Sequence, residues 1–358
     1  MTGLFVRGMH GLGDNVHQRA IVRAWIKRGF DVSLETAWPC IYHDLPIRCI
    51  YKPVALRAQL KNAQRERAKF VLGPSPHHTT NAPHISYSRD RIERTPSKTF
   101  LEAMFQSVGL GDEYVNADMS LPIPEMWAAD ADALITGWHT TKPILLYRPL
   151  VVRPEWRGSG IRNANVDQYA ELIAMIRDCF FVVSIADLEP NREWIVGPRL
   201  IADASFHHGE LSFDTLAAIM ARAALVYTSS GFPAVLGPAV GTPTISIQGG
   251  FEPARWHADG ARWAPYLGID TKDPCVCSGA CNKVCSKLID MPPARAAVAE
   301  FVGKLGFSAF AETRPLGEMF APAEAMPPSP PPPRVAHPPS VRIGHPALLA
   351  RMYRNAKA

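Results

Sequence analysis

Short apolar runs alternate with amphipathic stretches from the start of the chain. Leu4–Val6 is an apolar run typical of a buried strand, and a glycine-rich turn follows it. Apolar residues from Val16 to Ala24 then recur at helical spacing, and Gly29 is placed to end that helix. Residues 31–36 have the pattern of a second strand. A strand, a glycine loop, a helix and a strand in this order predict a parallel α/β sheet.

The same alternation continues to about residue 140. We expect strands at residues 48–52, 69–72 and 84–87, a helix at 98–108 that Gly109 closes, and a helix at 125–136. The next strand signal comes only after residue 140. The sequence therefore predicts a first domain over residues 1–140.

A second alternating segment follows residue 140. It predicts strands at 144–147, 180–185, 200–202, 225–227 and 244–247, and helices at 165–178, after Ser212 as N-cap, and at 232–240. We place this second domain at residues 141–320. Two such domains in series put a cleft between them, which is a favoured place for ligands.

Residues 321–358 have a different composition. They are rich in proline, with a run at Pro330–Pro333, and this predicts an extended linker without a core. The last apolar stretch, residues 347–353, has two interpretations. It is either a short amphipathic helix that docks on this protein or a protein partner, or a frayed tail.

Composition limits the class of protein. The chain has 358 residues, 47% hydrophobic and 20% charged, which fits two folded domains and excludes wholesale disorder. We expect neither a membrane-spanning helix nor a signal peptide, because no long uncharged apolar stretch is present. The net charge of +5 fits an anionic substrate, a nucleic acid or an anionic membrane surface, and it also fits an ordinary enzyme.

The chain has seven cysteines, of which four are clustered. A disulfide scaffold is typical of small secreted proteins, whereas this chain is large and we expect no signal peptide. The cysteines therefore favour a protein of the reducing cytoplasm. The cluster leaves a structural zinc site and a disulfide or free thiols as alternatives, with an iron–sulfur cluster less favoured. Its members are Cys275, Cys277, Cys281 and Cys285.

The loop after the first strand carries the strongest local signal. Gly11 and Gly13 let the backbone approach a ligand closely, and the following helix directs its amides at the same space. The spacing is not that of a dinucleotide fingerprint, and no phosphate-loop lysine follows. Asp14 is either a general base at the carboxyl edge of the sheet or the N-cap of a helix starting near Asn15.

Two further segments have the chemistry of an anion site. Hydroxyl groups and amides open a helix after the strand at 225–227, and arginines fill the loop after Tyr147. The alternatives are a serine cap with a tight turn and a solvated surface loop. The residues concerned are Thr228, Ser229, Ser230 and Gly231 in the first segment and Arg148, Arg153, Arg157 and Arg162 in the second.

Together these segments resemble glycosyltransferase family nine, the ADP-heptose:lipopolysaccharide heptosyltransferases and their relatives. The first motif is Gly11-Leu12-Gly13-Asp14, and the stretch Leu216–Trp256 is similar to the donor-side signature. The similarity spans residues 3–305 in the same order and spacing. The resemblance implies a GT-B fold, in which two Rossmann-like domains face each other across a cleft, with the acceptor on the N-terminal side.

The chain departs from the family at the donor signature. Ser229 stands where the family usually has Asp, and Ala234 stands where it usually has His. At the start of the first helix of the second domain, Arg162 keeps a cation but the usual Trp-Pro is missing. These departures put ADP-heptose as the donor, and activity itself, in question.

The resemblance implies an inverting transfer that needs no metal. Asp14 would deprotonate an acceptor hydroxyl beside the loop of His10, Gly11 and Gly13. The arginines and the Ser229–Gly231 amides would stabilise the departing nucleotide diphosphate, and Glu189 would meet the ribose.

Family resemblance favours a lipopolysaccharide or surface-glycan acceptor, worked on in the cytoplasm or at the inner membrane face. Two alternatives remain. One is a glycosyltransferase acting on a modified base in DNA. The other is an inactive binding module that acts through its tail.

Overall fold

The computed structural model describes residues 2–52, 60, 64–71, 82–153, 162–190, 192–274, 286–307 and 316–321. Residues 1–324 belong to one compact unit. The four clustered cysteines, Arg157 and residues 322–358 of the proline-rich tail lie outside the described residues. The hypotheses about a zinc site and a docking tail therefore stay predictions.

The first sheet contains three parallel strands, β1 (Thr2–Arg7), β2 (Phe30–Thr36) and β3 (Arg48–Tyr51), in the order β1-β2-β3. Helix α1 (Leu12–Lys27) connects β1 to β2, as the sequence predicts. The strand expected at 69–72 is wrong at its start, where Arg67–Lys69 is a 3-10 turn. Within the part of the chain that the structure describes, single bridges from Ile50 to Val71 and from Arg7 to His84 extend the sheet at its two edges.

The second sheet contains six strands, all parallel, in the order β12-β11-β10-β4-β6-β9. Chain order runs outward from β4 to β6 and β9, then returns to the other side of β4 for β10, β11 and β12. The strand order thus reverses between β4 and β10. The bounds are β4 Ile144–Tyr147, β6 Phe181–Ile185, β9 Ala204–Phe206, β10 Leu225–Ser229, β11 Thr244–Ile247 and β12 Tyr266–Ile269.

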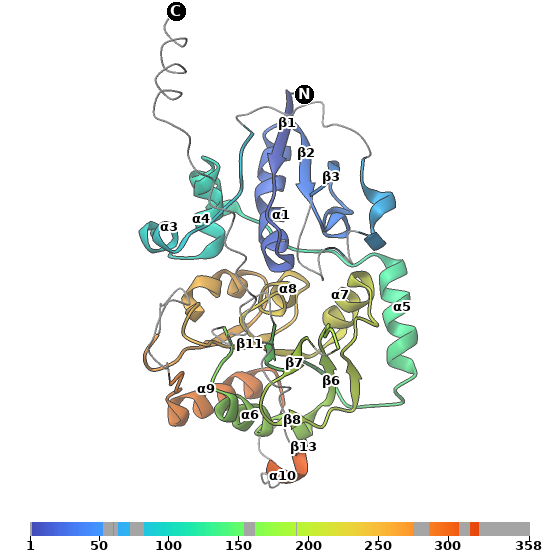
Figure 1. Cartoon of the computed structure of the whole chain (residues 1–358), viewed down its shortest axis with the longest axis vertical. Helices are drawn as coiled ribbons and strands as arrows, with labels where there is room; N and C mark the ends of the chain where they lie inside the picture. The colour runs from blue at the N-terminus through green and yellow to red at the C-terminus, as the bar shows by residue number, and fades with distance from the viewer. Residues whose placement is uncertain are drawn as a thin grey trace, which may run out of the picture. The chain divides into compact units, whose positions relative to one another are not determined.

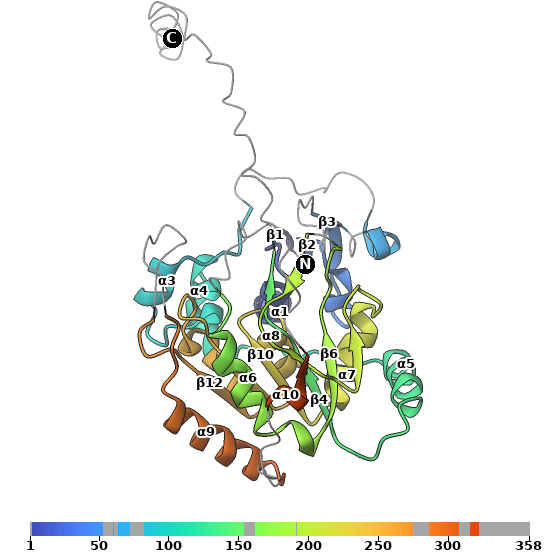
Figure 2. The ribbon, with the colours of Figure 1, turned by 60° about the horizontal axis from the view of Figure 1, so that its bottom comes forward.

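Helices cover both faces of the second sheet (Figure 2). On strand β4, Ile144 and Leu146 pack with helices α7 (Phe213–Arg222) and α8 (Pro233–Ala239). Leu145 and Tyr147 point the other way, toward helices α6 (Val166–Ala174) and α9 (Met291–Lys304). Burial on both faces explains why these strands are continuous apolar runs rather than alternating ones.

Helix α5 (Glu125–Thr136) precedes the second sheet in the chain but packs against its helix α7 (Figure 1). Arg222 of α7 donates two hydrogen bonds to the carboxylate of Asp132 on α5, at 2.8 and 2.9 Å. The bounds of α5 agree with the sequence prediction. The remaining described elements are α3 Arg89–Arg94, α4 Phe100–Ser107, α10 Leu316–Met319, β5 Val151–Val152, β7 Trp194–Ile195, β8 Arg199–Leu200 and β13 Phe320–Ala321.

A fully buried arginine ties α1 to its surroundings. Arg19 forms a two-point ion pair with Asp44, with nitrogen–oxygen distances of 2.8 and 2.9 Å. It also donates to the carbonyl oxygens of Ser120, at 2.8 and 3.0 Å, and Ile41. The guanidinium is thereby paired and hydrogen-bonded, which is the condition for burying a charge.

No helix among the described residues has both the length and the apolar character needed to cross a bilayer.

Candidate active site

A cavity of about 500 Å³ lies where the carboxyl ends of strands from both sheets converge. It is lined by residues that follow β1, β4, β6, β10 and β11. In open parallel sheets, ligands bind outside the carboxyl ends of the strands at the point where the strand order reverses. Here that point lies between β4 and β10, where Arg148, Ser230 and Gly231 line the cavity.

Asp14 lies on the cavity wall, in the first turn of α1. The helix begins at Leu12 with Gly11 as its N-cap, so the interpretation of Asp14 as an N-cap is wrong. Asp14 instead folds back over Gly11, where an added Cβ would collide with its carboxylate. The Tyr87 hydroxyl donates to Asp14 Oδ1 at 3.2 Å. Asp14 is therefore a fixed, half-buried carboxylate.

Burial raises the pKa of Asp14 above its ordinary value of 3.8. The positive charge of Arg162 and the hydrogen bond from Tyr87 oppose this rise, and the negative charge of Glu252 adds to it. A carboxylate with a raised pKa in a cavity is a better proton acceptor than a free one, which is the property of a general base.

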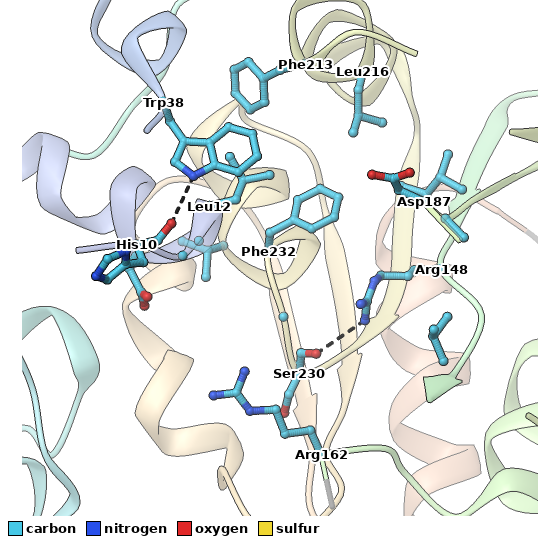
Figure 3. A pocket seen from close by; sticks show the side chains of 18 of the residues that line it. His10, Leu12, Trp38, Arg148, Arg162, Asp187, Phe213, Leu216, Ser230 and Phe232 are labelled. Carbon is cyan, nitrogen blue, oxygen red and sulfur yellow. Dashed lines mark hydrogen bonds between the residues drawn. The ribbon is translucent and has the colours of Figure 1, made fainter. Parts of the chain in front are cut away.

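Partly buried hydrogen bonds hold the loop before Asp14 in place. The Asn15 side-chain amide donates to the carbonyl oxygens of Met9, at 3.1 Å, and Gly11, at 2.7 Å. The Trp38 indole donates to the His10 carbonyl oxygen at 3.1 Å (Figure 3). Gly13 serves packing as well, since an added Cβ would lie 3.3 Å from Phe232 Cα at the start of α8.

Arg148 follows β4 and lies across the cavity from the loop of His10 (Figure 3). Its Nη1 is 3.5 Å from the Ser230 carbonyl oxygen, and the guanidinium passes over Gly231. Burial and the neighbouring cations Arg153 and Arg162 lower the pKa of Arg148 to about 10, so it stays charged at neutral pH. Among the described residues it forms no ion pair with a carboxylate. This cation is suited to an anionic ligand.

Gly231 itself has φ +144°, a backbone conformation that side chains rarely adopt. Ser230 and Gly231 line the cavity, whereas the side chains of Thr228 and Ser229 are buried beneath it. Of the three expected hydroxyl side chains, Ser230 alone belongs to the cavity lining.

Of the other residues predicted to bind the donor, two arginines line the cavity and Glu189 does not. Arg153 and Arg162 line the cavity, and Arg153 Nε lies 3.6 Å from Glu193 Oε1. Glu189 is not part of the lining, and it accepts hydrogen bonds from Arg192 at 3.2 Å. Asp187, two residues earlier, lines the cavity in its place.

The hydroxyl of Tyr169 supports Arg148 from below by donating to its backbone oxygen at 2.7 Å. We expect Tyr169→Phe to lower the free energy of unfolding by about 1 kcal/mol, because a buried carbonyl loses its donor. Tyr147→Phe is the matched control, since the Tyr147 hydroxyl makes no hydrogen bond among the described residues. Urea denaturation of both variants checks this, and an equal loss in both would contradict the assigned role.

Sequence reasoning missed four residues that line the cavity with Asp14. Tyr87 and His17 had no signal beyond composition, whereas Glu252 lies within the quoted donor-side stretch and His257 directly follows it. Glu252 is buried, and its Oε1 lies 2.6 Å from Arg162 Nη2. Burial lowers the pKa of His17 to about 3, with His257 adding to the shift, so this imidazole is neutral.

An apolar wall closes the cavity opposite Arg162 (Figure 3). It includes Trp38 from the first half of the chain and Phe213, Leu216 and Phe232 from the second. The site therefore combines a charged end with an apolar end, as small-molecule sites commonly do.

No cluster of candidate metal ligands occurs among the residues that the structure describes. Cys40 and Cys49 are free thiols, and both are buried. The zinc hypothesis concerns only the cysteines outside the described ranges.

No family model matches the sequence, and no curated protein matches it at a significant level. Solved structures do match. A glycosyl transferase family 9 protein from Veillonella parvula is 13% identical with a TM-score of 0.54, over 85% of this chain and 98% of that chain. The E. coli ADP-heptose LPS heptosyltransferase II is 14% identical with a TM-score of 0.52, also over 85% and 98%. The iron-containing dodecameric glycosyltransferase TibC from enterotoxigenic E. coli is 11% identical with a TM-score of 0.51, over 85% and 76%.

These matches confirm the predicted GT-B fold. They also confirm, at the level of the fold, the resemblance to glycosyltransferase family nine that the motifs indicated.

Proposed function

We propose that this protein is a glycosyltransferase that moves a sugar from a nucleotide-sugar donor to an acceptor hydroxyl, with inversion at the anomeric carbon. One observation carries the proposal. A single cavity places a carboxylate of raised pKa, Asp14, on one wall and Arg148, a cation without a carboxylate partner among the described residues, on another. The reaction needs a proton acceptor and a site for a departing diphosphate.

In the proposed reaction, Asp14 takes the proton from the acceptor hydroxyl. The acceptor oxygen forms a bond to the anomeric carbon while the bond from that carbon to the diphosphate oxygen breaks. Negative charge then develops on the diphosphate, and Arg148 and Arg153 stabilise it. Because attack and departure occur on opposite faces of the carbon, its configuration inverts.

The acceptor class remains the one that the motifs favour, a lipopolysaccharide or surface glycan, reached from the cytoplasm or at the inner membrane face. The heptosyltransferase II whose structure is similar is, by its description, an LPS enzyme. Neither transfer to a modified DNA base nor an inactive binding role draws support from the matching structures, which are transferases.

A ligand titration tests the donor site. We expect one of ADP, UDP, GDP or CMP, or its sugar conjugate, to raise the melting temperature, because a ligand that binds only the folded state stabilises it. Arg148→Gln should weaken the affinity for that nucleotide at least about tenfold, since it removes a charge-assisted contact to phosphate. Isothermal titration calorimetry measures this.

The matched control is Arg48→Gln, because Arg48 pairs with Asp31 at the surface and is not part of the cavity lining. It should leave the affinity unchanged. No stabilisation of the wild-type protein by any nucleotide at millimolar concentration would defeat the proposed function.

A further inference from the structure

Arg162 and Arg148 line the same cavity, but their surroundings differ. Arg162 Nη2 lies 2.6 Å from Oε1 of the buried Glu252, so its charge is already matched by a carboxylate. Arg148 makes no such ion pair among the described residues, and its charged neighbours are cations. Of these two arginines, only Arg148 therefore presents an uncompensated charge to a ligand.

The two guanidinium groups also point to different parts of the cavity (Figure 3). The Arg148 group lies beside Ser230, at the strand-order reversal. The Arg162 group points toward the side where His10 lies. That side carries the loop that leads into Asp14.

The backbone of Arg162 is held tightly. Ser229 Oγ donates to the Arg162 carbonyl oxygen at 3.1 Å, and Lys287 Nζ donates to the Asn163 carbonyl oxygen at 2.9 Å. An added Cβ on Gly249 would lie 2.6 Å from the Arg162 carbonyl oxygen. Ser229 at the end of β10, Gly249 after β11 and Lys287 thus hold the backbone of this segment, and Glu252 holds the guanidinium end of the Arg162 side chain.

We propose that Arg162 is a positioning residue of the acid–base step, held by Glu252 so that its charge acts on Asp14, while Arg148 binds the departing diphosphate. This inference rests on the proposed function for its catalytic meaning. It also assigns different roles to Arg148 and Arg162, which the sequence analysis placed together in one donor-binding group.

Groups from several elements line the cavity with Asp14, and four of them act on its protonation. The Gly11 amide and the Tyr87 hydroxyl donate to it, Arg162 supplies positive charge and Glu252 negative charge. His17 lies one turn along α1, and His257 Nε2 is 3.7 Å from Glu252 Oε2. Removing the Arg162 charge takes away the positive charge that favours ionised Asp14 and leaves the negative charge of Glu252, so Asp14 should hold its proton to higher pH.

The pH dependence of donor turnover distinguishes the two arginines. With Arg162→Gln, we expect the acidic limb of the kcat/KM profile to move to higher pH by about one unit. Nucleotide affinity should change by less than about threefold, because no phosphate contact is lost. With Arg148→Gln, affinity should fall while the acidic limb stays in place. Arg162→Lys keeps the charge and should restore most of the wild-type profile.

A second measurement needs neither donor nor activity. The side-chain carboxyl carbons of aspartate, labelled with ¹³C, report each titration by NMR, and Asp14→Asn identifies the Asp14 signal. In the ligand-free protein, Arg162→Gln should raise the pKa of Asp14, and Arg148→Gln should leave it unchanged. If the proposed function is wrong, the wild-type protein will bind no nucleotide. The NMR titration does not depend on nucleotide binding, so it tests the inference separately.

Two results would overturn the inference. One is an Arg162→Gln protein that loses nucleotide affinity as strongly as Arg148→Gln with an unmoved acidic limb. The other is an Asp14 titration that Arg162→Gln leaves unchanged.

Discussion

Replacing Asp14 by Asn should lower donor turnover by about 10²–10⁴-fold, the usual contribution of a positioned general base. Asn has nearly the same shape and can still accept from the Tyr87 hydroxyl, but it cannot take a proton from the acceptor. Nucleotide affinity should stay within about threefold, because Arg148 and Arg153 are intact. Steady-state kinetics and calorimetry on the same preparation measure the two quantities.

The same substitution should not destabilise the protein at neutral pH. The folded protein raises the pKa of Asp14 above 3.8, so it binds this proton more tightly than the unfolded chain does. Stability is therefore lost as the pH rises from about 3.8 through the folded-state pKa, and the ionised carboxylate is a cost above that range. The asparagine side chain never ionises, so the Asp14→Asn variant should melt at the wild-type temperature or higher at pH 7.

Asp132→Asn is the control, because Asp132 lies exposed on α5 and is not part of the cavity lining. Its turnover should match the wild type. An Asp14→Asn protein with wild-type turnover would remove Asp14 from the mechanism, and one that fails to fold would contradict the assignment of its ionised form as a stability cost.

Replacing Arg19 by Met should lower the free energy of unfolding by about 3 kcal/mol, because it removes the buried partner of Asp44 and leaves the carbonyl groups of Ser120 and Ile41 without their arginine donor. Arg19 is fully buried, and Met keeps most of its volume but none of its hydrogen bonds. Urea denaturation measures the loss.

Arg23→Met makes the same chemical change one turn further along α1. Arg23 also pairs with Asp44, at 3.1 Å, but it is partly exposed, so its loss should cost less than about 1 kcal/mol. Similar losses in the two variants would show that burial does not set the strength of the Arg19 pair.

The sequence predicted the elements that have strong local signals. The glycine loop, α1 and α5 follow from periodicity, and Ser212 is the N-cap of α7 as expected, accepting from the Thr215 amide. The short strands β9 and β12 went unpredicted, and residues 84–87 contribute only one bridge. Whether a short apolar run becomes a strand depends on the partner beside it, which propensity alone does not contain.

The candidate site was predictable where its residues follow strands of a parallel sheet. Asp14, Arg148 and Ser230 all do so, and the sheet brings them to one edge. Tyr87 reaches Asp14 only through tertiary packing, and nothing in its local sequence marks it. The ribose contact expected for Glu189 depends on which way a loop turns, and the loop directs Asp187 into the cavity instead.

Helix α5 has a consequence for how the protein is made. Its packing partner α7 begins at Phe213, so α5 is synthesised well before the surface that covers its buried Trp127 and Ala131. Chains fold from the N-terminus during synthesis. The part of the α5 surface that α7 covers therefore stays exposed after α5 has been synthesised. A chaperone that binds nascent chains would find its target there until residues 213–222 emerge and the helix docks.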